Sequence, residues 1–176
     1  MAVRNVVLVH GAFADGVVIT EAGNDPKVAG LVYAAAFAPD ANQSIGEISQ
    51  NFPKPPGLDA LRPLPDGYLL LTEKGIHEDF AQDASQEDKA LLFAVQPQTA
   101  GAIFEAKPKA AAWKSRPSWY IIATKDRMIA PEQEAAMAQV ISATTSRLPS
   151  SHAVMVSHPK EVADVIMTAA EAAGAR

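Results

Sequence analysis

The chain begins with two runs that are apolar at almost every position. Residues 6–9 (VVLV) end at His10-Gly11, and residues 28–37 (VAGLVYAAAF) end before Pro39. Continuous apolar runs of this kind are typical of strands buried on both faces, as in a parallel sheet. Residues 17–22 between them predict a short helix that stops at the Gly-Asn-Asp-Pro sequence after it. Together they predict a βαβ unit.

A similar alternation returns in the last third of the chain. Residues 118–123 (SWYIIA) predict a strand, and Pro131 opens a helix that runs to about residue 141. Residues 144–148 predict a short strand, and Pro159 opens a final helix with apolar residues at helical spacing. Strands that alternate with helices predict an α/β fold with a parallel sheet flanked by helices.

Between residues 39 and 117 the composition changes. Sequences such as PKPPG and PLPDG argue against a continuing parallel sheet. Leucine and aromatic residues in the same segment need burial, which argues against a disordered linker. We therefore predict a core of residues 1–38 and 118–176, with about four recognisable strands, and an inserted helical cap of residues 39–117.

Residues 76–94 of this segment show short helical patterns with several acidic side chains. We interpret these side chains as a solvated helical face rather than a metal cluster, because exposed charge runs are the ordinary case. The acidic residues are Glu78, Asp79, Asp83, Glu87 and Asp88.

Composition narrows the function classes. The 176 residues suit one domain, and the absence of cysteine excludes thiol nucleophiles, disulfides and cysteine-bound metals. The formal net charge of -5 disfavours nucleic-acid binding. The four histidines, His10, His77, His152 and His158, form no metal-ligand spacing, so we expect neither a metal site nor a cofactor.

Membrane and export signals are weak. No apolar run approaches the ~20 residues of a membrane span. The apolar stretch at the N-terminus is only about five residues long, too short for a signal peptide. We therefore expect a cytoplasmic protein with no membrane partner.

Polar residues follow three of the predicted strands: His10-Gly11, Asp126 and His152. Because sites in parallel sheets lie at the carboxyl ends of strands, Asp126 and His152 could lie on adjacent loops. An Asp that orients a His is the acid–base half of a Ser-His-Asp triad. The alternative is that Asp126 caps a turn and His152 is an exposed loop residue. The turn at residues 10–13 (HGAF) could expose backbone N–H groups for an oxyanion hole.

Four motifs together resemble a known family. They are VVLVHGAFADG at 6–16, GLVYAAAFAPD at 30–40, PSWYIIATKDRMI at 117–129 and LPSSHAVMVSHPKEVADVI at 148–166. Over nearly the whole chain they resemble the small bacterial α/β-hydrolases. That group is similar to the branch of hydroxynitrile lyases and methyl-ester esterases.

The resemblance implies a role for each candidate residue. Asp126 would be the triad acid and His152 the triad base. Ala12 and Phe13 would supply oxyanion N–H groups. His10 and Gly11 would shape that loop, and the cap would close near Trp113.

The sequence departs from the family at the nucleophile. It contains no Gly-x-Ser-x-Gly, and residues 17–26 (VVITEAGNDP) resemble the helix that normally follows the nucleophile. About two βα units, or ~60 residues, are absent at the junction of Gly16 and Val17.

Three explanations for this absence are open. In the first, the complete molecule contains a further segment there and is an ordinary hydrolase. In the second, the deletion is real, and the first strand takes the place of the nucleophile strand in a four-stranded sheet. In the third, another hydroxyl group, that of Ser151 or Thr20, replaces the missing nucleophile. The second explanation leaves an apolar strand edge open, so it predicts a homodimer through that edge, or aggregation.

The function expected from these features is hydrolysis of a small carboxylic ester by a Ser-His-Asp type mechanism, with the Ser outside these 176 residues. One alternative is an inactive, shortened hydrolase fold or a binder of small apolar ligands. A further alternative is a lyase of the hydroxynitrile lyase type.

Overall fold

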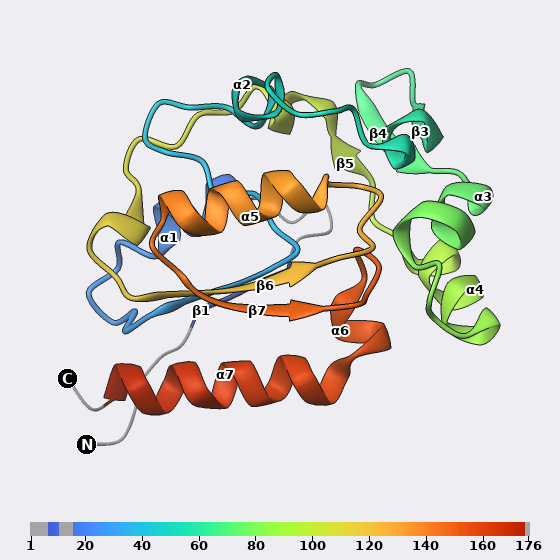
Figure 1. Ribbon diagram of the computed structural model, residues 1–176. Coiled ribbons are helices and arrows are strands. Elements are labelled where there is room, and N and C mark those ends of the chain that lie inside the picture. Colours follow the sequence, from blue (N-terminus) through green and yellow to red (C-terminus); the bar gives the residue numbers. More distant parts are fainter. Residues whose placement is uncertain (1–6, 11–15, 175–176) are drawn as a thin grey trace.

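The computed structural model describes residues 7–10 and 16–174 (Figure 1). Its centre is a parallel sheet with strands in the order β1-β2-β6-β7. The strands are β1 (Val7–His10), β2 (Leu31–Ala34), β6 (Ser118–Ala123) and β7 (Thr144–Leu148). The predicted α/β fold with about four parallel strands is confirmed.

Helices cover both faces of this sheet. Helices α1 (Gly16–Ala22) and α5 (Pro131–Val140) lie on one face, and α6 (Val154–Ser157) and α7 (Pro159–Gly174) lie on the other (Figure 1). The alternation of side chains along β6 explains this: Tyr120 belongs to one buried cluster together with Met137 of α5, whereas Ile121 belongs to another together with Val162 of α7. Both faces of β6 are therefore apolar and buried.

Residues 39–117 contain short helices, as expected, and a small second sheet that the sequence did not predict. That sheet is antiparallel and has the strand order β3-β4-β5. The elements of the segment are α2 (Ile45–Ser49), η1 (Pro56–Ala60), β3 (Leu61–Pro63), β4 (Tyr68–Leu71), α3 (Glu73–Gly75), the π-helical turn η2 (Ile76–Phe80), α4 (Gln86–Val95), β5 (Thr99–Ala100), η3 (Gly101–Phe104) and η4 (Ala112–Lys114).

The segment leaves the core and returns to it at one place. The indole Nε1 of Trp113 donates to the carbonyl oxygen of Pro39 at 3.0 Å. Nearby, the backbone N–H of Asn42 donates to the carbonyl oxygen of Pro108 at 2.7 Å. These bonds hold the two ends of the segment together.

Strand β1 lies at one edge of the parallel sheet. It pairs with β2 from Val7 opposite Leu31 to His10 opposite Ala34, with no second neighbour among the described strands. Unpaired strand edges favour pairing with another chain. The explanation in which the deletion is real therefore predicts a dimer, or aggregation, in size-exclusion chromatography with light scattering; a stable monomer at high concentration would contradict that explanation.

No helix within residues 7–10 and 16–174 is long and apolar enough to cross a bilayer.

Candidate active site

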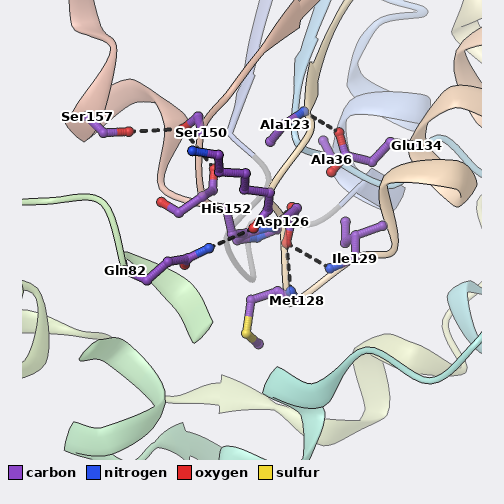
Figure 2. A network of polar contacts seen from close by, with 12 residues as sticks. Ala36, Gln82, Ala123, Asp126, Met128, Ile129, Glu134, Ser150, His152 and Ser157 are labelled. Carbon is purple, nitrogen blue, oxygen red and sulfur yellow. Dashed lines mark hydrogen bonds and ion pairs between the residues drawn. The ribbon is translucent and has the colours of Figure 1, made fainter. Parts of the chain in front are cut away.

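The structure brings Asp126 and His152 together at the carboxyl ends of β6 and β7. His152 Nδ1 lies 2.6 Å from Asp126 Oδ2 (Figure 2). The His152 side chain is 3% exposed and that of Asp126 0%. The alternative in which His152 is an exposed loop residue is therefore wrong.

Backbone hydrogen bonds fix the orientation of Asp126. Its Oδ1 accepts from the N–H groups of Met128 at 2.6 Å and Ile129 at 3.0 Å (Figure 2). Because Oδ1 is occupied by the turn, Oδ2 faces His152. A carboxylate in this position accepts the proton on Nδ1, which makes Nε2 the basic nitrogen of the neutral ring. The pair thus sets the tautomer that general-base catalysis requires.

The two loops that carry the pair are also bonded to each other beyond the strands. The backbone N–H of Thr124 donates to the carbonyl oxygen of Leu148 at 2.8 Å, and that of Lys125 donates to the carbonyl oxygen of Ser150 at 3.0 Å. The ladder of β6 and β7 therefore continues almost to Asp126 and His152. Lys125 itself is exposed.

Opposing effects act on the Asp126 carboxyl. Burial would raise its pKa, but the charge of His152 and hydrogen bonds from His152, Glu134 and the backbone of Ile129 outweigh burial and lower the pKa below its ordinary value. Asp126 therefore carries the negative charge of this site at neutral pH.

Glu134, on the first turn of α5, is a second buried carboxyl beside Asp126. It is fully buried, and its Oε2 accepts from the backbone N–H of Ala123 at 2.9 Å (Figure 2). Burial and the charge of Asp126 raise the pKa of Glu134 well above its ordinary value. A proton on Glu134 can then be donated to Asp126, whereas two ionised carboxylates would have no donor between them.

The protonation of Glu134 predicts a pH effect on stability. Its pKa is raised in the folded state, so the free energy of unfolding should fall as pH rises from ~4.3 towards the raised value, by about 1.4 kcal/mol per pH unit at most. Glu134→Gln keeps an acceptor for Ala123 and a donor for Asp126 but does not titrate, so this fall should vanish. Urea unfolding at several pH values measures it.

Glu132→Gln is the matched control, since Glu132 is exposed on the same helix turn. It should keep the pH dependence of the parent protein. Equal slopes for the parent and Glu134→Gln would show that Glu134 is ionised in the folded protein.

Apolar side chains from the segment of residues 39–117 lie beside the pair. The Phe80 ring centroid is 5.3 Å from that of His152, with the rings inclined by 58°. Phe80 belongs to a buried cluster that joins Ile76 and Leu71 of the segment to Met128 and Ala153 of the core loops. This cluster covers the side of His152 that faces Phe80.

The remaining candidates are placed as follows. His10 is the last residue of β1, and Gly11, Ala12 and Phe13 lie outside the described residues. Ser151 and Thr20 are both 0% exposed. Across the part of the chain that the structure describes, no group of three or more acidic or histidine side chains could hold a metal ion.

Sequence reasoning missed Glu134. A signal existed, because the buried residues Gln133, Glu134, Met137 and Ala138 follow helical spacing and put a carboxyl on the apolar side of α5. It also misassigned part of the acidic face, since Asp79 is buried and Asp83 bonds to the core.

Several solved structures share this fold. A pyrethroid hydrolase from Sphingobium faniae JZ-2 matches with a TM-score of 0.75 and 22% identity over 98% of this chain and 73% of its own. A polyneuridine aldehyde esterase matches with 0.75 and 20% over 94% and 71%. A methylesterase from Arabidopsis matches with 0.74 and 18% over 96% and 70%. More than a quarter of each of these chains has no counterpart here.

None of the curated protein sequences matches the chain. A model of the alpha/beta hydrolase family, in contrast, matches residues 4–165. With that match across most of its length, and with the sheet and helices described above, this chain belongs to the alpha/beta hydrolase family.

Proposed function

We propose that the protein hydrolyses small carboxylic esters, with His152 as general base and Asp126 as the residue that orients it. The observation that carries the proposal is the buried 2.6 Å contact between His152 Nδ1 and Asp126 Oδ2. The structural neighbours support the substrate class, because two of them are described as esterases and one as a pyrethroid hydrolase.

The proposed reaction is acyl transfer. His152 Nε2 takes the proton of a nucleophilic hydroxyl as its oxygen attacks the ester carbonyl carbon, and the negative charge of Asp126 stabilises the imidazolium that forms. The same proton passes to the departing alkoxide, and water then releases the acid by the reverse sequence of proton transfers. Ala12 and Phe13 would donate N–H groups to the oxyanion, in a loop shaped by His10 and Gly11.

The presence or absence of a nucleophile decides between this function and a second candidate. The 176 residues contain no Gly-x-Ser-x-Gly, so the proposal takes the serine from a further segment at the Gly16/Val17 junction. The second candidate is an inactive fold that binds a small apolar ligand. It is favoured by the direct pairing of β1 with β2, which leaves no space between them for a nucleophile strand.

The test is turnover of a chromogenic acetate ester by protein of measured intact mass. A mass larger than 18.6 kDa by ~6–7 kDa, with turnover lost in the His152 variants described in the Discussion, would support the hydrolase. Turnover at the buffer rate by protein of 18.6 kDa would support the second candidate.

A further inference from the structure

Residues 79–83 of the cap segment contact the loops on both sides of the Asp126–His152 pair. These five residues (DFAQD) begin with the last two residues of the π-helical turn η2 and end before α4. π-Helical turns are rare and occur frequently at functional sites. The turn ends with the bond from Ala81 N–H to the carbonyl oxygen of Ile76 at 2.9 Å.

Two contacts reach the residues that flank Asp126. On one side, Arg127 Nε donates to Asp79 Oδ1 at 2.7 Å. On the other, Gln82 Nε2 donates to the carbonyl oxygen of Lys125 at 2.6 Å (Figure 2). The Asp126 loop is therefore bonded to the cap immediately before and immediately after the carboxylate.

Two further contacts reach the residues that flank His152. The backbone N–H of Ser151 donates to Asp83 Oδ2 at 2.9 Å, and that of Ala153 donates to the carbonyl oxygen of Phe80 at 3.0 Å. The Phe80 ring lies against the imidazole itself. The same five residues thus bracket both members of the pair, although 68 residues of chain separate Asp83 from Ser151.

The contact of Asp83 with Ser151 is the one in which a cap side chain bonds to the His152 loop. A carboxylate that accepts from a backbone N–H forms a charge-assisted bond. Asp83 is exposed, whereas Ser151 is fully buried, so removal of the carboxylate leaves a buried N–H unsatisfied. Partial burial of the carboxyl group would raise the pKa of Asp83, but bonds from Ser151 and Ser157 outweigh it and lower the pKa, so Asp83 is ionised at neutral pH.

We propose that residues 79–83 are positioning residues for the Asp126–His152 pair, with Asp83 as the one whose side chain bonds to the His152 loop. They hold the two loops at the spacing that the short Nδ1–Oδ2 contact needs. The cap segment is then part of the acid–base machinery as well as a cover. A substrate that displaces the segment would change the geometry of the pair.

The experiment observes the pair directly by NMR of the full chain. The readout is the downfield proton signal of His152 Nδ1–H and its rate of exchange with water. Asp83→Ala should shift this signal upfield and accelerate its exchange by on the order of tenfold or more. Asp83→Asn keeps an acceptor oxygen for Ser151 and should restore most of the signal.

Two controls separate positioning from a general loss of stability. Glu87→Ala removes an exposed acidic residue of α4 and should leave the signal unchanged. The amide of Ile121, in the centre of β6, should exchange at the same rate in all variants. An Asp83→Ala spectrum identical to that of Glu87→Ala would overturn the proposal, as would equal acceleration at Ile121.

The proposal is independent of ester turnover. If the protein shows no turnover but Asp83→Ala changes the His152 signal, the proposed function fails and the positioning role stands. If turnover is observed and the signal does not change, the positioning role fails and the hydrolase stands.

Discussion

Replacing His152 by alanine is expected to reduce ester hydrolysis by at least ~10³-fold, because no other base replaces Nε2 in the proposed reaction. Initial rates with the chromogenic acetate ester measure the loss. Since Asp126 is buried against His152, alanine would leave a buried charge without its partner and could unfold the site. His152→Gln offers an amide donor to Asp126 without a basic nitrogen, and it should fold and be equally inactive.

His158→Ala is the matched control. His158 lies at the other end of α6, with its Nδ1 3.7 Å from Glu161 Oε1, and it is only partly buried. Its replacement should leave the rate within about twofold of the parent rate. Undiminished turnover in a folded His152→Gln protein would remove His152 from the mechanism and with it the proposed function.

Replacing Asp126 by asparagine is expected to reduce turnover by on the order of 10⁴-fold while the loop stays folded. The asparagine Oδ1 can still accept from Met128 and Ile129, but its amide would donate towards Nδ1. Nδ1 would then carry no proton, and the ring would adopt the tautomer that cannot act as a base at Nε2. The rate with the acetate ester measures the loss of turnover, and the ¹⁵N chemical shifts of His152 measure the change of tautomer.

Asp126→Ala distinguishes catalysis from folding at the same position. It removes the acceptor of two buried N–H groups and should lower the free energy of unfolding by about 1–3 kcal/mol for each group left unsatisfied. Asp126→Asn should avoid most of this loss. If Asp126→Asn retained parent turnover, Asp126 would be a turn-forming residue only.

The two Asp126 variants should also differ from the parent protein in how their stability changes at acidic pH. The pKa of Asp126 is lowered in the folded state, so its stabilising effect is present above ~3.9 and is lost as pH falls through the lowered value. Neither variant titrates at this position, so both should lack this part of the acid-induced loss of stability.

The neighbouring positions of Asp126 and His152 could be predicted because the sequence patterns that indicate them are local. Each member follows a strand that is apolar or β-branched, and strands on either side of one helix lie side by side in a parallel sheet. The chain order alone therefore put Asp126 and His152 on neighbouring loops, and the structure places their atoms in contact.

The contacts from residues 79–83 were not predictable in the same way. In sequence, Asp79 and Asp83 lie among acidic neighbours and have the pattern of a solvated surface. Their partners, Arg127 and the backbone of Ser151, are distant in sequence and carry no periodic signal. The strands β3, β4 and β5 were missed for a related reason, since two to four residues are too few to show alternation.

The position of the pair along the chain has a consequence for the order of folding. Asp126 and His152 are only 26 residues apart, and β6, α5 and β7 form one uninterrupted unit around them. Contacts of short sequence separation lose little chain entropy on closing and form early. The loops that carry Asp126 and His152 are therefore expected to come together when β6, α5 and β7 pack, and the short contact between the two side chains is expected to become fixed later, when residues 79–83 bond to both loops.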